Sequence, residues 1–161
     1  MVRFKNRYLC FEIDYETHNR PTGTARVSLT IPELASIVRE HVRENFGDYG
    51  LGSILGAFTV KYFSSFTNVG IIRVARDHYH MIWSALTFIN YIKGTRCMVR
   101  VIHLSGTIKK SQLAAIKHDR SMIHRLTALA AKDPGSGISI SKVQVEKMLR
   151  DSENSIKSLE P

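Results

Sequence analysis

The sequence predicts an α+β fold in which a mainly antiparallel sheet is packed against helices. Three observations lead to this prediction. Short segments with an apolar residue at every second position alternate with longer segments whose apolar residues recur every three or four positions. These segments follow the order strand, helix, strand, strand, helix, strand, and a long helical segment comes after the last strand. The 161 residues are enough for one domain with a sizeable core.

The first part of the chain predicts one strand and one helix. Residues 7–14 alternate between apolar and other side chains, which is typical of a half-buried strand, and the polar residues 15–28 predict a loop. Thr30 and Glu33 have the spacing of a capping box, so a helix should begin there, and Gly47 should end it.

The central part predicts a hairpin after a glycine-rich segment. Residues 48–56 are interpreted as a flexible linker or a tight turn, because their glycines follow a helix and do not have the spacing of a phosphate-binding loop. Two strands are expected over residues 57–64 and 69–75, and the short segment between them suits a hairpin turn.

A second helix should begin with Asp77 as its cap and run to about Lys93, where Gly94 stops it. Trp83 lies on the apolar stripe of this helix and is interpreted as a core residue. Residues 97–104 then have the pattern of a fourth strand.

A long helix is predicted over residues 108–132. Its apolar residues, which include Leu113, are numerous enough for it to lie across the sheet. The resulting order β-α-β-β-α-β is typical of the ferredoxin-like sandwich that RNA-recognition domains share. We therefore expect one RNA-recognition-like domain over residues 1–132 with the added helix. Residues 133–161 should form a C-terminal extension that is a short helix or disordered.

The distribution of charge is uneven along the chain. The formal net charge is +9, and residues 50–132 hold 12 Lys and Arg against only two acids, Asp77 and Asp119. The excess therefore belongs to the folded part of the chain. A structured surface of one sign attracts a polyanion, and nucleic acid is the usual partner of this kind.

The two cysteines, Cys10 and Cys97, are too few for a disulfide framework or a zinc site, so a reducing compartment fits the sequence. The polar N-terminus has no apolar segment of the kind found in secretory signals. The longest nearly apolar stretch, residues 81–89, is too short to span a bilayer. We expect no association with a membrane.

The enzyme hypotheses find little support in the residues. Glu12, Asp14 and Glu16 would share one side of a strand and could hold Mg²⁺, but a solvated strand end is the favoured interpretation. His78 and His80 lack a third metal ligand, and no nucleophile motif of the G-x-S-x-G type occurs. We therefore predict no catalytic residue and no metal site.

RNA contact is expected at edges, loops and termini. The third predicted strand carries no aromatic residue, which disfavours base stacking on the sheet. Lys110, Lys117 and His124 recur every seven residues and predict one solvated stripe on the long helix. Seven cations are the candidate RNA-binding residues: Arg3, Lys5, Arg7, Arg73, Arg76, Lys109 and Lys110.

Three segments carry a family resemblance. MVRFKNRYL at residues 1–9, IIRVARDHYHMIWSALTFI at 71–89 and RVIHLSGTIKKSQ at 100–112 resemble, in that order, the Pop-five protein subunit family of ribonuclease P and ribonuclease MRP. The resemblance implies an RNA-recognition-like sandwich with added helices. It also implies that Arg3, Lys5 and Arg7 form the basic N-terminus that lies close to the RNA catalytic centre in this family.

The resemblance implies a non-catalytic subunit of an RNA-based endoribonuclease, located in the nucleus and nucleolus. Such a subunit stabilises the catalytic RNA for 5′ maturation of precursor tRNA and for processing of ribosomal RNA precursors. Its implied partners are the catalytic RNA of ribonuclease P and MRP, a larger barrel-like protein subunit and a small paralogous subunit of similar fold. No cofactor is expected on the protein, and Mg²⁺ is expected in the RNA.

Two other functions remain open on the sequence alone. One is a protein-only interaction module of ferredoxin-like fold that never touches RNA. The other is a weak stand-alone nuclease that uses Mg²⁺ held by Glu12, Asp14 and Glu16.

Overall fold

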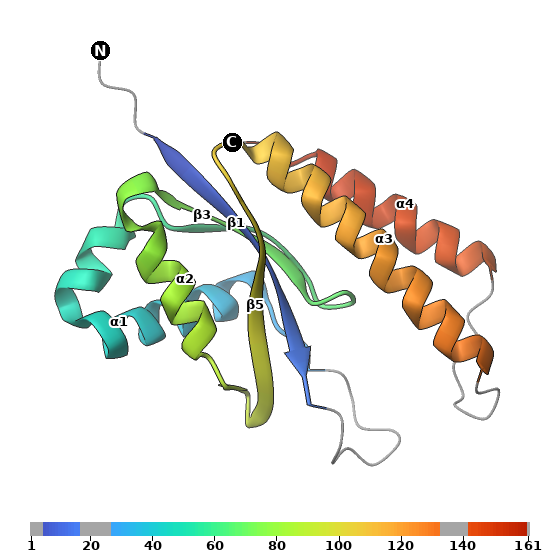
Figure 1. The fold of residues 1–161 in the computed structure, drawn as a ribbon, viewed down its shortest axis with the longest axis horizontal. Coiled ribbons are helices and arrows are strands. Elements are labelled where there is room, and N and C mark those ends of the chain that lie inside the picture. The colour runs from blue at the N-terminus through green and yellow to red at the C-terminus, as the bar shows by residue number, and fades with distance from the viewer. Residues whose placement is uncertain (1–4, 17–26, 133–141, 161) are drawn as a thin grey trace.

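The fold is that of a computed structural model, which describes residues 5–16, 27–132 and 142–160. A five-stranded sheet lies between two helical layers, with α1 and α2 on one side and α3 and α4 on the other (Figure 1). The strands are β1 (Asn6–Tyr15), β2 (Thr59–Ser64), β3 (Val69–Ala75), β4 (Tyr91–Ile92) and β5 (Thr95–Ser105). Their order is β2-β3-β1-β5-β4, and every neighbouring pair is antiparallel. The predicted α+β, ferredoxin-like class is confirmed.

The helices are α1 (Ile31–Leu55), α2 (Tyr79–Phe88), α3 (Ile108–Lys132) and α4 (Lys142–Lys157). The predicted capping box starts α1, because Thr30 Oγ1 accepts from the Glu33 backbone N–H at 3.4 Å and Glu33 Oε2 accepts from the Thr30 N–H at 2.8 Å. None of the helices in the described ranges combines the length and the apolar content needed to cross a membrane.

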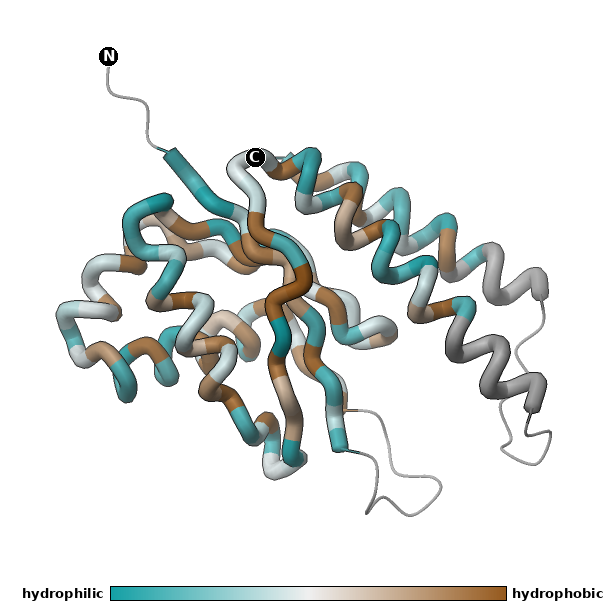
Figure 2. The backbone as a smooth tube through the Cα atoms, in the orientation of Figure 1, coloured by the Kyte–Doolittle hydropathy of each residue, from teal (hydrophilic) through white to brown (hydrophobic). Residues whose placement is uncertain are grey.

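The central strand β1 is buried on both faces. Leu9, Phe11 and Ile13 point into a core shared with α1 and α2, whereas Tyr8 and Cys10 point into a second core shared with α3 and α4. Figure 2 shows apolar segments along the strands between the two helical layers. The sequence therefore correctly predicts that the long helix covers the second face of the sheet.

The second core is small and closes around α3 and α4. Ile108, Ala115 and Ile116 of α3 pack with Ile71 of β3, and Ile156 of α4 is fully buried in the same cluster. The expected division of the chain after residue 132 stays a prediction.

The sequence led us to expect a linker or tight turn in the glycine-rich segment 48–56, and this prediction is wrong. Its residues up to Leu55 are helical, and they continue α1 beyond a kink at Gly47, which adopts φ 67°. Glycine reaches this left-handed region without the steric penalty of a side chain. Ile54 then returns to the core, and its burial explains why the segment is ordered as a helix.

The second helix also differs from its prediction. Asp77 does not cap it, because a short 3-10 turn, Arg76–His78, precedes α2 and no side chain caps either element. The helix ends at Phe88, and Lys93 and Gly94 form the β4–β5 turn with φ values of 50° and 74°. Lys93 Nζ there donates to Glu33 Oε1 at 2.7 Å, so the turn is tied to the start of α1.

Trp83, which the sequence placed in the core, and Leu113, which it counted among the apolar residues that let the long helix cover the sheet, are both exposed. Trp83 is 39% exposed and Leu113 is 68% exposed. Ile82 and Leu86 fill the sheet-facing side of α2, and Trp83 is turned about 100° away from Ile82 by the helical repeat. The apolar periodicity in the sequence is only approximate, so it did not distinguish residues at the centre of a helix's buried face from residues at its margin.

We expect Gly70→Ala to destabilise the fold. A Cβ at Gly70 would lie 2.5 Å from Cζ of Phe11 and 3.1 Å from the Tyr62 carbonyl oxygen, and the Phe11 ring is fully buried. The free energy of unfolding should fall by about 1–3 kcal/mol, as for other overpacked cores. Gly52→Ala is the control, because its Cβ would meet nothing within 4 Å. Equal urea midpoints for the two variants would contradict this account of the core.

Candidate nucleic-acid interface

The sheet register brings several predicted RNA-binding residues to one end of the molecule. β1 begins where β3 and β5 end, because Asn6 pairs with Ala75 and Tyr8 pairs with Ser105. Helix α3 starts three residues after β5, at the same edge (Figure 1). We call this edge the sheet end, and its cations are Lys5, Arg7, Arg73, Arg76, Lys109 and Lys110. Arg3 lies outside the described residues.

Backbone contacts fix the N-terminal cations against their neighbours. The Arg76 N–H donates to the Lys5 carbonyl oxygen at 2.8 Å, so these two exposed residues lie side by side. The Arg7 guanidinium lies over the β5–α3 turn, because its Nη1 is 3.2 Å from the place where a Cβ of Gly106 would be. A side chain at position 106 would crowd this arginine.

Arg73 lies on the opposite face of the sheet from Arg7. It pairs with Tyr8, and residues directly opposite in antiparallel strands share a face, so Arg73 points toward the layer of α3 and α4. Its Nη2 is 3.5 Å from Thr59 Oγ1, and its buried Nε has no hydrogen-bond partner among the described residues. The sheet end therefore presents cations on both faces.

Lys61 joins Arg73 and was missed by the sequence analysis. Burial lowers the pKa of the Lys61 ammonium, the nearby charge of Arg73 lowers it further, and Glu160 of the C-terminal segment opposes both effects. The register of β2 shifts between Val60 and Tyr62, which is the irregularity that contains Lys61. A bulge of this kind leaves no signal in a local sequence pattern.

The cations of the sheet end lack ion-pair partners among the described residues. Across the described ranges, none of its six cations forms an ion pair with a carboxylate. Other cations do, for example Arg43 with Asp48 at 3.1 Å and Lys93 with Glu33 at 2.7 Å. Unpaired cations at one edge make a positive potential that attracts an anion.

The three carboxylates near the end of β1 do not converge on a metal site. Glu12 is buried, and it accepts a hydrogen bond from Arg100 Nε at 2.7 Å and lies 2.7 Å from His118 Nε2. The expected solvated strand end is therefore wrong for Glu12, because α3 covers this face of the central strand. Asp14 is exposed, and Glu16 lies 3.6 Å from Arg96. No group of three or more potential ligands among the described residues could hold a metal ion.

Polar contacts tie α3 to the sheet and to α4. The Ser105 and Ser111 hydroxyls are 2.9 Å apart, and Gln112 Nε2 donates to the Ile156 carbonyl oxygen at 2.8 Å. Farther along, Ser152 of α4 donates to Asp119 Oδ2 at 2.5 Å. Burial raises the pKa of Asp119, although the hydrogen bond from Ser152 acts in the opposite direction.

Both thiols are buried and unsuited to nucleophilic chemistry. Burial raises the pKa of Cys10 to about 12, helped by the charges of Asp119 and Glu12, and burial raises the pKa of Cys97 to about 11. Because the thiolate is the reactive form, neither cysteine is a candidate nucleophile at neutral pH.

Comparison with known proteins gives a consistent result. A sequence model of the Rpp14/Pop5 family matches residues 7–116. The chain is 45% identical over 133 residues to the ribonuclease P/MRP protein subunit POP5 of Schizosaccharomyces pombe, and the match covers 80% of this chain and 96% of that protein. It is 33% identical over 127 residues to the human protein of the same name, covering 76% of this chain and 75% of that protein.

A solved structure supports the fold. One chain of the cryo-EM structure of yeast ribonuclease MRP superposes on this chain with a TM-score of 0.52, covering 67% of this chain and 79% of that chain. The two are 9% identical, so this likeness concerns the fold alone.

We expect both native thiols to resist an aromatic disulfide reagent. Cys10 is fully buried and Cys97 is 6% exposed, and their raised pKa values keep them protonated at pH 8. Absorbance at pH 8 should show almost no reaction in buffer and two thiols per chain in guanidinium chloride. A rapid reaction of either cysteine in the native protein would contradict the described packing.

Proposed function

Because the chain belongs to the Rpp14/Pop5 family, we propose that it is a protein subunit of ribonuclease P and ribonuclease MRP. The observation that carries this proposal is similarity along most of the chain to subunits of that name, at up to 45% identity among those compared. The matched range, residues 7–116, contains almost the whole sheet and the first part of α3.

In this proposal the protein is non-catalytic and the RNA carries out the cleavage. The protein's part is to neutralise phosphate repulsion where RNA strands pack closely, and so to stabilise the active shape of the RNA. The cations of the sheet end, which form no ion pair among the described residues, are suited to this task. Each phosphate contact releases condensed counterions, which makes binding favourable and sensitive to salt.

The two kinds of cation at the sheet end would act differently. Arg7 and Arg76 carry planar guanidinium groups that can donate two parallel hydrogen bonds to one phosphate. Lys5, Lys109 and Lys110 carry compact charges on flexible stems, so they neutralise charge without fixing geometry. Because α3 and α4 cover the second face of the sheet, bases are not expected to stack on it.

The substrates and partners follow from the family. We propose 5′ maturation of precursor tRNA and processing of ribosomal RNA precursors, with Mg²⁺ held by the RNA. The proposed partners are the catalytic RNA, a larger barrel-like protein subunit and a small paralogous subunit of similar fold. The proposed location is the nucleus and nucleolus.

Purification from the protein's own cells tests the central proposal. The tagged full chain should bring down one or two abundant structured RNAs together with an activity that cleaves precursor tRNA, and nuclease treatment of the eluate should abolish that activity. An eluate without RNA would favour a protein-only interaction module. Cleavage that survives nuclease would favour a protein nuclease.

We expect Lys5→Ala/Arg7→Ala to slow precursor-tRNA cleavage by the reconstituted particle while the fold is kept. Affinity for the catalytic RNA should fall, and the slope of log affinity against log salt should decrease by about 0.9 for each phosphate that is no longer neutralised. Lys147→Ala/Arg150→Ala removes the same charge from exposed positions on α4 and is the control. Equal salt slopes and equal cleavage rates for the two double variants would exclude the sheet end as an RNA site.

A further inference from the structure

The outer face of α3 carries cations and no acid along its described length. Seven of its residues between 108 and 124 are exposed: Lys109, Lys110, Leu113, Lys117, Arg120, Ser121 and His124. All of them except Leu113 and Ser121 are lysine, arginine or histidine. The one acid in this stretch, Asp119, is 2% exposed and is turned inward to Ser152 of α4. The outer face is therefore positive over more than four helical turns.

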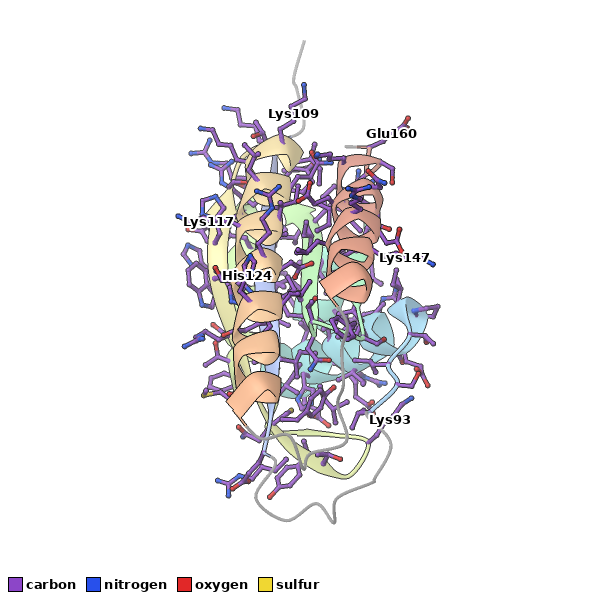
Figure 3. The ribbon with its side chains drawn as sticks, turned by 90° about the vertical axis from the view of Figure 1, so that its right-hand side faces the viewer. Lys93, Lys109, Lys117, His124, Lys147 and Glu160 are labelled. Atoms are coloured by element: carbon purple, nitrogen blue, oxygen red, sulfur yellow. The ribbon has the colours of Figure 1, made fainter. Side chains whose placement is uncertain are left out.

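Two lysines and a histidine form a straight array. Lys110, Lys117 and His124 are spaced by seven residues, so they lie about 10 Å apart and extend over about 21 Å along one side of the helix. Figure 3 shows Lys109, Lys117 and His124 following α3 outward from its start. We call Lys110, Lys117 and His124 the α3 ridge.

The neighbouring helix does not neutralise the ridge. Glu153 of α4 is 2.5 Å from Arg120 Nη2 and 3.3 Å from Lys157 Nζ, so this carboxylate is already shared by two other cations. Arg120 lies on the α4 side of α3, where it contacts Glu153, and the helical repeat turns Lys117 about 60° and Lys110 about 80° from it, toward the side away from α4. Neither of these two lysines pairs with a carboxylate in the part of the chain that the structure describes.

We propose that the α3 ridge binds the phosphate backbone of a double-stranded segment of RNA. This inference rests on the proposed function, because it assigns a second RNA contact to the same ribonucleoprotein subunit. The ridge begins at Lys110 of the sheet end and extends away from it, so bound RNA would continue from the sheet end along α3.

The residues of the ridge favour a duplex over a single strand. Proteins that bind single strands combine cations with aromatic side chains on which bases stack. The exposed residues of α3 up to His124 include no aromatic ring except that of the histidine itself. Double-stranded RNA is instead recognised by its shape and phosphates, which flexible lysines on a rigid helix can follow.

The same residues disfavour a protein partner. The centre of a protein interface is depleted of charge and enriched in aromatic and other large apolar residues. The outer face of α3 offers one such residue, Leu113, which lies among lysines. The test must nevertheless be able to detect an acidic protein chain bound to the ridge in place of RNA.

A tethered probe tests the ridge directly. An iron chelate that cuts nearby RNA is attached to Lys117→Cys in the full chain, and the native Cys10 and Cys97 do not interfere because both are buried. Lys109→Cys serves as the reference at the sheet end, and Lys147→Cys on α4 serves as the control. In the reconstituted particle, the probe at 117 should cut both strands of a paired RNA segment severalfold more strongly than the probe at 147.

The possible results separate the two proposals. If the probe at 109 cuts RNA but the probe at 117 cuts no more strongly than the probe at 147, the ridge proposal is overturned and the proposed function stands. Cuts from 117 confined to unpaired nucleotides, or a photo-cross-link from 117 to a protein chain instead of RNA, also overturn it. No cutting from any position contradicts the proposed function itself.

A binding measurement gives an independent readout. Lys117→Glu should weaken binding of the full chain to an RNA duplex severalfold, and the slope of log affinity against log salt should fall by about 0.9 for the phosphate that position 117 no longer neutralises. Lys147→Glu makes the same charge change on α4 and should leave both quantities unchanged. If both variants weakened binding equally, the effect would come from the net charge of the protein and not from the ridge, and the proposal would be overturned.

Discussion

The architecture depends on one constraint, which is that the central strand is buried on both faces. All residues from Tyr8 to Ile13 are buried, so each face of β1 must be covered by a helical layer. Helices α1 and α2 cover one face, and α3 with α4 covers the other. The open sheet on which RNA-recognition domains stack bases is therefore occupied by protein. In the proposed function, contact with RNA is therefore expected at the end of the sheet and at the outer surfaces of the helices.

The second layer is held by buried polar contacts. Glu12 and Asp119 are buried between the sheet, α3 and α4, and each has partners on another element. A shift of α3 by one turn would separate Glu12 from His118 and Asp119 from Ser152, and it would leave Asp119 buried without its hydrogen-bond donor, which is costly. These contacts consequently fix the position of α3 along the sheet and its rotation about its own axis. The direction in which Lys110 and Lys117 point follows from that rotation.

Sequence patterns predicted the elements well where a breaker and a periodicity agreed, as for β3 and α3, whose bounds match. They failed where tertiary packing decided, as in residues 48–56, whose glycines hid a helix stabilised by the burial of Ile54. Cations could be selected from the sequence, but their proximity at the sheet end depends on strand register. The place of Lys61 beside Arg73 depends in addition on the bulge in β2 that contains it. The burial of Glu12 was missed because local alternation does not reveal which strand is central.

The unpaired cations have an energetic consequence for the free protein. Burial and then the nearby charge of Arg73 lower the pKa of the Lys61 ammonium, and the Arg73 Nε is buried without a partner among the described residues. Charges separated by less than the Debye length, about 8 Å at physiological ionic strength, are only partly screened by salt. A bound phosphate would offset this repulsion, so part of the binding free energy is relief of repulsion already present in the native fold. Because such a ligand binds the folded chain and not the unfolded one, it must also raise the stability of the subunit. In the proposed function, folding and RNA binding would in this way be coupled through the same cations.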